Sequence, residues 1–231
     1  MPEIIYGVRP VVEALKGRRR RVIEVLDASN NAEVRAVVGR VPVKNVSRDR
    51  VDELARGGVH QGVVARVESY PYSSLDEILA VSRPLVLVLD GVTDPRNLGA
   101  VLRAADGAGA SGVVIPKDKA VGVTAAAVKA SAGASEHVRV ARVTNLRRAV
   151  DAMKRANVWV YAAEAGGTVY GKLDLAGPTA FVLGSEGRGV RRLVREACDG
   201  TVSVPMLGAV SSLNVSVAAA VLAYEARRQR G

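Results

Sequence analysis

The chain has 231 residues, enough for one large domain or for a small domain followed by a larger one. Its 33 Lys and Arg against 23 Asp and Glu give a net charge of +10, which fits a nucleic-acid partner or a protein that is simply basic. The single cysteine, Cys198, excludes an intramolecular disulfide framework, and with only two histidines we expect no metal ion. No stretch reaches about 18 consecutive apolar residues, and the first residues do not resemble a secretion signal, so we expect a cytoplasmic protein without membrane contact.

Residues 1–68 predict a small α/β domain built from short alternating elements. The expected elements are a helix at Pro10–Leu15, a strand at Val22–Leu26, a helix at Ala32–Val38 and a strand at Gly62–Val67. Four adjacent arginines, Arg18–Arg21, precede the first of these strands and predict either a solvated turn or a contact with RNA. Residues 69–82, which contain Pro71, Ser73 and Ser74, are typical of a linker.

From residue 83 to residue 231 apolar strands alternate with longer helical segments. Strands are expected at Leu85–Asp90, Gly112–Pro116, Val138–Ala141, Val158–Ala162, Ala180–Gly184 and Thr201–Pro205. Because these runs are almost continuous in Val, Leu, Ile and Ala, both faces of each strand are expected to be buried. The pattern indicates an α/β domain in which helices cover both faces of a parallel sheet.

The first motif that carries chemistry, Asp90–Arg103, runs from a strand end through a loop into a helix. Asp94 followed by Pro95 predicts the N-cap and the first residue of that helix. Arg96 and Arg103 share one helix face, with small residues between them. This face is either a plain exposed surface or a pair of guanidinium groups that stands above a ligand.

The second motif, Phe181–Val190, is an apolar strand that runs directly into a glycine-rich turn with one carboxylate, Glu186. Ligands of open α/β sheets bind at the carboxyl ends of the strands, and glycines allow the backbone to approach a ligand closely. The alternative is a tight turn with an incidental acid.

The third motif, Val204–Ser216, is a strand end, a loop of small residues and the start of a helix that is apolar on nearly all sides. Ser211 or Ser212 is a candidate N-cap for this helix. Polar side chains at the mouth of a buried helix need partners, and a bound ligand can supply them to Ser212, Asn214 and Ser216.

The C-terminal helix is expected from about Leu213 to Arg227, with two apolar stripes at helical spacing. The first stripe is Val215, Ala219, Leu222 and Ala226, and the second is Val217, Val221 and Tyr224. The sheet of the same domain can cover only one stripe. The other predicts a dimer contact or burial by the rest of the chain.

Gly107, Gly109 and Gly112 match the pattern G-x-G-x-x-G. The dinucleotide fingerprint follows a strand and opens a helix, whereas this run ends a helix and enters a strand. The context therefore excludes a nicotinamide site at this position.

Taken in order, the three motifs resemble the signature motifs of the SpoU-type ribose 2′-O-methyltransferases of the SPOUT superfamily. Within that family, Ile5–Val11 and Gly58–Val67 are similar to the bacterial enzymes that methylate a guanosine of 23S ribosomal RNA. The resemblance is weakest across the linker and around Glu164–Lys172. A transfer RNA ribose 2′-O-methyltransferase or a resistance-type rRNA methylase is the alternative.

The resemblance implies a ribosomal-protein-like RNA-binding domain at residues 1–68 and a catalytic domain with a C-terminal trefoil knot. It also implies a homodimer with the site completed across the interface, and S-adenosylmethionine as the methyl donor. By position in the motifs, it assigns catalytic roles to Asn97, Arg103, Glu186, Ser212 and Asn214, and donor contacts to Leu183, Gly184, Gly187, Val204, Met206 and Leu213. Because a guanidinium is almost never deprotonated in a protein, we expect Arg103 to polarise the 2′-hydroxyl or position an RNA phosphate.

Overall fold

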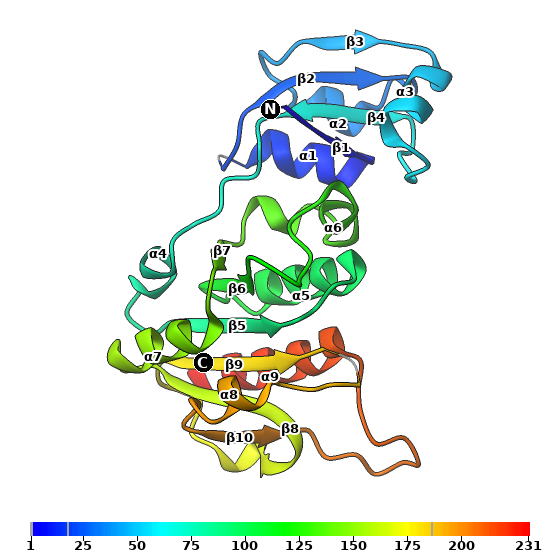
Figure 1. Ribbon diagram of the computed structural model, residues 1–231. Coiled ribbons are helices and arrows are strands. Elements are labelled where there is room, and N and C mark those ends of the chain that lie inside the picture. Colours follow the sequence, from blue (N-terminus) through cyan, green and yellow to red (C-terminus); the bar gives the residue numbers. More distant parts are fainter. Residues whose placement is uncertain (1, 18, 186) are drawn as a thin grey trace.

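The computed structural model describes residues 2–17, 19–185 and 187–231, which form two sheets stacked along the long direction of the molecule (Figure 1). The four-stranded sheet belongs to the N-terminal part of the chain and the six-stranded sheet to the rest. Within the described residues, no helix is both long and apolar enough to cross a membrane.

The N-terminal sheet has the order β1-β4-β2-β3, with β4 antiparallel to both of its neighbours. Its elements are β1 (Glu3–Tyr6), α1 (Val8–Lys16), β2 (Val22–Asp27), α2 (Ala32–Val37), β3 (Val43–Asn45), α3 (Arg48–Ala55) and β4 (Val63–Val67). The four predicted elements are present with bounds that differ by at most a few residues. The sequence patterns missed β1, β3 and α3, which are short and only partly buried.

The segment between the two sheets is ordered rather than structureless. It contains α4 (Leu75–Leu79), which begins with a capping box formed by Ser74 and Glu77. The Tyr70 hydroxyl donates to the backbone carbonyls of Ser135, at 2.9 Å, and Val138, at 3.2 Å. These bonds fix the start of the segment against the larger unit.

The six-stranded sheet is entirely parallel, as predicted, and has the order β10-β8-β9-β5-β6-β7. Its strands are β5 (Leu85–Asp90), β6 (Gly112–Pro116), β7 (Val140–Val143), β8 (Trp159–Val169), β9 (Thr179–Gly184) and β10 (Gly200–Ser203). Alternate residues of β5 point to opposite faces, and both faces are buried. The prediction of strands buried on both faces is therefore confirmed for β5, β6 and nearly all of β9. It is wrong for β8, which has exposed residues such as Trp159, and only partly right for β7 and β10, because these strands lie at or near the edges of the sheet.

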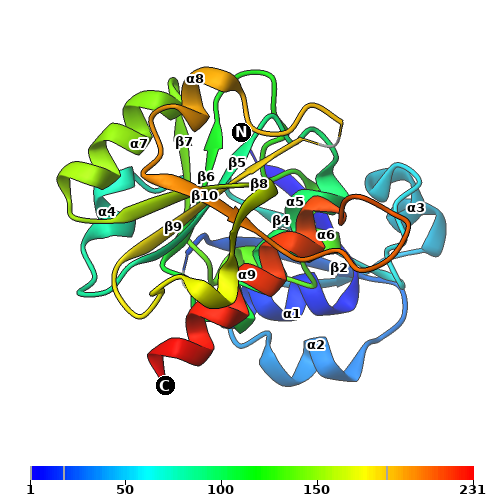
Figure 2. The ribbon, with the colours of Figure 1, turned by 90° about the horizontal axis from the view of Figure 1, so that it is seen from below.

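Helices cover both faces of this sheet (Figure 2). One face carries α5 (Pro95–Gly107), α6 (Ala125–Ala130), the 3-10 turn η1 (Ala134–Glu136), the turn η2 (Tyr170–Lys172) and α9 (Val215–Arg230); the other carries α4, α7 (Leu146–Arg155) and α8 (Arg192–Arg195). β5 continues through α5 to β6 on one side, whereas β9 continues through α8 to β10 on the other. The connections therefore diverge between β5 and β9, where open α/β sheets place their ligands.

A buried ion pair joins the two units. Arg20 donates through Nε and Nη2 to the two carboxylate oxygens of Glu136, at 3.0 and 2.6 Å, and both side chains are only 1% exposed. Arg20 also contacts Glu3, and Arg19 donates to the Pro71 carbonyl and the Ser73 hydroxyl. The expectation of a solvated or RNA-binding arginine turn is thus wrong for Arg20, because distant residues bury it; Arg18 lies outside the described residues.

We expect Arg20→Ala to lower the free energy of unfolding by about 3–5 kcal/mol, because it leaves the Glu136 carboxylate buried without its cation. The double variant Arg20→Met/Glu136→Met should lie much closer to the parent, since an apolar pair needs no compensating charge. Urea unfolding measures both, with the exposed Arg21→Ala as control. A double variant as unstable as Arg20→Ala would contradict this account.

Candidate active site

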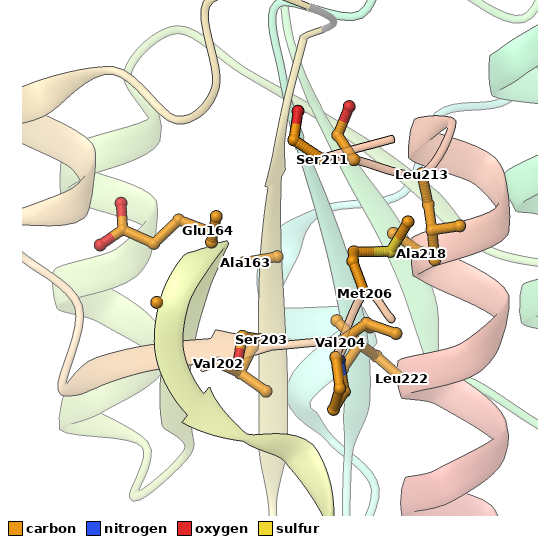
Figure 3. Close-up of a pocket in the computed structure, with 14 residues that line it drawn as sticks. Ala163, Glu164, Val202, Ser203, Val204, Met206, Ser211, Leu213, Ala218 and Leu222 are labelled. Atoms are coloured by element: carbon orange, nitrogen blue, oxygen red, sulfur yellow. The ribbon is translucent and has the colours of Figure 1, made fainter. Parts of the chain in front are cut away.

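A cavity of about 350 Å³ lies between the middle of β8, where its register with β10 shifts, the carboxyl end of β10 and the start of α9. It is lined by Ala163, Glu164, Ala165, Gly166, Val202, Ser203, Val204, Pro205, Met206, Ser211, Ser212, Leu213, Ala218 and Leu222. Figure 3 shows Met206 and Leu213 on the side of α9 and Ala163 on the side of β8. The volume suits a nucleoside-sized ligand, and the mixture of apolar walls with a few polar groups is typical of such sites.

Three of the six predicted donor contacts, Val204, Met206 and Leu213, line this cavity, as does the predicted catalytic residue Ser212. The other three donor contacts lie on β9 or in the loop after it. Leu183 is buried within β9, Gly184 ends that strand, and Gly187 is exposed with a positive φ of 79°.

The sequence analysis missed the wall formed by Ala163–Gly166. The expected strand ended at Ala162, but β8 continues to Val169 and pairs with β10 beyond a register shift. In Figure 3 the Glu164 side chain points away from Met206, and its carboxylate meets Arg195 at 3.4 Å. The available signal was the position of this stretch at the carboxyl end of an apolar strand, which is where ligands bind.

Two of the predicted catalytic residues meet where α5 and α9 begin. The Asn214 amide donates through Nδ2 to Oδ1 of Asn97 at 3.0 Å. Oδ1 of Asn214 accepts from the backbone N–H and the hydroxyl of Ser216, at 2.9 and 2.6 Å. Asn214 is therefore the N-cap of α9, in place of the serines that the sequence suggested.

The start of α5 is as predicted, because the Asp94 side chain accepts from the Arg96 N–H at 2.8 Å and Pro95 is the first helical residue. Arg103 is exposed and lies outside the cavity, in a shallow groove between α5 and α9 that Ser216, Val217 and Tyr224 also line. Within the described parts of the chain, no carboxylate forms an ion pair with Arg103.

The loop after β9 closes tightly on the end of its own strand. Ser185 pairs with Gly189 in an isolated bridge, and the Gly189 N–H donates to the Ser185 carbonyl at 2.9 Å. A Cβ atom at Gly184 would lie 1.9 Å from the backbone carbon of Gly189, so only glycine fits there. Glu186, the predicted acid of this motif, lies outside the described residues.

A buried carboxylate holds the exit of this loop. Asp90, at the end of β5, is paired in register with Gly184 of β9. Its Oδ2 accepts a hydrogen bond from the backbone N–H of Arg191 at 2.8 Å, and its Oδ1 accepts one from Nε of the same residue at 2.6 Å. The Asp90 side chain is fully buried, so this pair fixes the second motif against the first. The sequence analysis named Asp90 only as a strand end.

Two protein-family models match the chain. Residues 84–224 match the model of the SpoU rRNA methylase family. The chain belongs to this family. Residues 4–73 match a second model, described as RNA 2′-O ribose methyltransferase substrate binding. The chain is therefore a methyltransferase that uses S-adenosylmethionine to modify a ribose 2′-hydroxyl of RNA.

Relatives and solved structures span the same length. The chain is 47% identical to the 23S rRNA (guanosine-2′-O-)-methyltransferase RlmB of Haemophilus influenzae, with 100% of this chain and 99% of the relative covered. It is 42% identical to the protein of the same name from Escherichia coli, with both chains fully covered. The crystal structure of the SpoU methyltransferase AviRb from Streptomyces viridochromogenes in complex with the cofactor AdoMet matches with a TM-score of 0.87 at 29% identity, over 99% of this chain and 90% of that one.

We expect Asp90→Ala to weaken S-adenosylmethionine binding by at least about tenfold, because the loop after β9 loses both of its bonds to Asp90. A tenfold loss of affinity corresponds to about 1.4 kcal/mol. Asp90→Asn should lose less, since an amide oxygen still accepts the Arg191 N–H. Titration calorimetry measures the affinity, with the exposed Asp76→Ala as the matched control. Parent-like binding by Asp90→Ala would show that the pair does not organise the site.

Proposed function

We propose that the chain transfers the methyl group of S-adenosylmethionine to the ribose 2′-hydroxyl of a guanosine in 23S ribosomal RNA. The observation that carries the proposal is the cavity at the carboxyl edge of the sheet, which adjoins the Asn97–Asn214 contact. The full-length likeness to proteins named for that reaction supports this substrate. Mapping 2′-O-methylated nucleotides in ribosomal RNA from cells with and without the protein tests it, and an unchanged 23S pattern would refute it.

The donor fits the cavity by the chemistry of its lining. Val204, Met206 and Leu213 offer apolar contacts, while the Ser211 and Ser212 hydroxyls offer hydrogen bonds. When bound, the donor supplies a methyl group on a positively charged sulfonium. Leu183, Gly184 and Gly187 would contact it from the loop after β9, whose close packing on Gly184 keeps the backbone near the strand end.

The acceptor side requires that the 2′-hydroxyl be positioned and its proton removed. Holding two reactants in attack geometry contributes about 7–11 kcal/mol, and general-base help adds about 10²–10⁴-fold. We assign Arg103 to hydrogen bonding with the 2′-hydroxyl or a neighbouring phosphate, since a guanidinium donates five hydrogen bonds and accepts none. Asn97 and Asn214 would orient the reactants, and Glu186 and Ser212 complete the proposed catalytic set.

We expect Arg103→Ala to lower methylation at least about 100-fold and to leave donor affinity within about twofold, because Arg103 lies outside the donor cavity. Arg103→Lys should recover little, since a point charge cannot reproduce the planar fork. Single-turnover methylation and calorimetry measure the two quantities. Normal turnover by Arg103→Ala would remove it from the mechanism.

Residues 1–68 would bind the RNA and residues 83–231 would carry the chemistry, joined by residues 69–82. The net charge of +10 supports this assignment, and the N-terminal match to a substrate-binding family model agrees with it. We further propose that the C-terminal segment is threaded as a trefoil knot and that the protein works in the cytoplasm. The close structural match to SpoU methyltransferases supports the knot.

The same proposal includes a homodimer that buries the second stripe of α9. The first stripe, Val215, Ala219, Leu222 and Ala226, is buried against the sheet, as expected. In the second stripe Val217 is 46% and Tyr224 52% exposed, and the groove beside them contains Arg103. A second copy on this face would cover apolar surface and bring its residues to the site.

We expect Tyr224→Glu to dissociate the homodimer, because a charge would be buried in an interface of at least about 1,000 Å². Methylation should fall together with association. Light scattering at micromolar concentration measures the mass, with Arg155→Glu on α7 as the charge-changing control. A parent chain that is monomeric and fully active would defeat the claim.

A further inference from the structure

A second cavity, of about 550 Å³, lies at the same carboxyl edge of the six-stranded sheet. It is lined by the segment after β6, the start of α7 and the region of α8: Pro116, Asp118, Lys119, Thr144, Asn145, Leu146, Arg147, Arg191, Arg192, Leu193 and Val194. Residues of α7 and α8 line it, whereas residues of α9 line the cavity assigned to the donor. Figure 2 shows that α7 and α8 lie on the opposite side of the sheet from α9. The proposed reaction does not use it.

Of the four cationic side chains that line this cavity, two form ion pairs and two can bind an anionic ligand. Arg191 is held by the buried Asp90, and Arg192 pairs with Glu196 at 2.8 Å. Lys119 and Arg147 are exposed, and within residues 2–17, 19–185 and 187–231 neither forms an ion pair with a carboxylate. The single acid in the lining is Asp118, so the cavity as a whole favours an anion.

The remaining lining suits more than a bare anion. Leu193 is 50% exposed, which gives the cavity an apolar wall. The Thr144 hydroxyl and the first residues of α7 add hydrogen-bond donors, and the positive end of that helix adds to the cationic side chains. A phosphate with an attached flat, partly apolar group matches this combination, and one nucleotide of an RNA strand has both parts.

The position of the cavity connects it to the reaction site. Along the edge, β9 and β5 separate the strands of the donor cavity from β6 and β7. With a strand spacing of about 4.8 Å, β8 and β6 are about 14 Å apart, and the centres of the two cavities are on the order of 20 Å apart along the edge. Arg191 lines the second cavity and is also bonded to Asp90 at the exit of the second motif. An RNA strand that crosses the loops after β5 and β9 therefore reaches both.

We propose that this second cavity binds a nucleotide that flanks the methylated one, with its phosphate on Lys119 and Arg147 and its base or ribose against Leu193. The inference rests on the proposed function and deepens it. Phosphate contacts fix the register of a nucleic acid on a protein without reading its sequence. This cavity would thus determine which ribose along the strand reaches the donor.

The test measures methylation of 23S ribosomal RNA by the full chain over a range of salt concentrations. For Lys119→Ala/Arg147→Ala we expect KM for RNA to rise at least tenfold while donor affinity stays unchanged. The slope of log KM against log salt should fall by about 0.7–1.4, because each phosphate contact with a single strand contributes about 0.7. The matched control, Lys172→Ala/Arg155→Ala, removes two exposed cations from other parts of the domain, and its KM and slope should equal those of the parent.

A second variant separates the apolar contact from the charge. Leu193→Ser should raise KM for RNA several-fold without changing the salt slope, since it removes no cation. The proposal is overturned if Lys119→Ala/Arg147→Ala keeps the parent KM and slope, or if the control pair changes them equally. Both variants are compared with a parent enzyme that methylates RNA. A parent that binds no donor and methylates no RNA would refute the proposed function and not the role of the second cavity.

Discussion

The parallel pairing of β5 with β9 is the constraint on which the rest of the site depends. It sets Asp90 opposite Gly184, so the loops that leave the two strands begin side by side at one edge of the sheet. One loop leads into α5 with Asn97, and the other folds back on Gly184 and is bonded to Asp90 through Arg191. A register shift between these strands would separate the two motifs and leave the Asp90 carboxylate buried without a partner.

The same requirement for buried partners joins the two units of the chain. Arg20 and Glu136 are 116 residues apart in the sequence. Each can be buried only because the opposite charge of the other compensates its own. Around them, one continuous apolar cluster includes residues of both units, such as Val11 and Val25 on one side and Leu98 and Leu102 on the other. The N-terminal sheet therefore has a defined orientation relative to the six-stranded sheet.

Sequence patterns predict the elements whose burial is visible in the local sequence as a continuous or periodic run of apolar residues. β5 and β6 lie at their expected bounds, because strands covered on both faces have uninterrupted apolar runs. Three-residue β3 and half-exposed β1 have no such signature and owe their existence to pairing with distant strands. The burial of Arg20 could not be predicted either, because its partner Glu136 is 116 residues away and no local pattern relates the two.

The site residues also divide into those that local sequence patterns predict and those that depend on tertiary contacts. Motif residues that directly follow β10, such as Val204 and Met206, reach the cavity because the topology determines where the strand ends. Ala163–Gly166 were missed because the length of β8 depends on its bulged pairing with β10, a tertiary effect without a local pattern. The Asn97–Asn214 contact joins two helix starts that lie 117 residues apart, and only the packing of α5 on α9 brings them together.

The position of Arg103 follows from helix geometry. Asn97 and Arg103 are six residues apart on α5, which at about 100° per residue places their side chains about 120° apart around the helix axis. Asn97 contacts Asn214 at the start of α9, whereas Arg103 lies further along α5, in the groove that Val217 and Tyr224 of α9 also line. In the homodimer proposed above, a second copy placed on this groove would cover Val217 and Tyr224 and lie against Arg103. Catalysis and association would then depend on the same face of the protein.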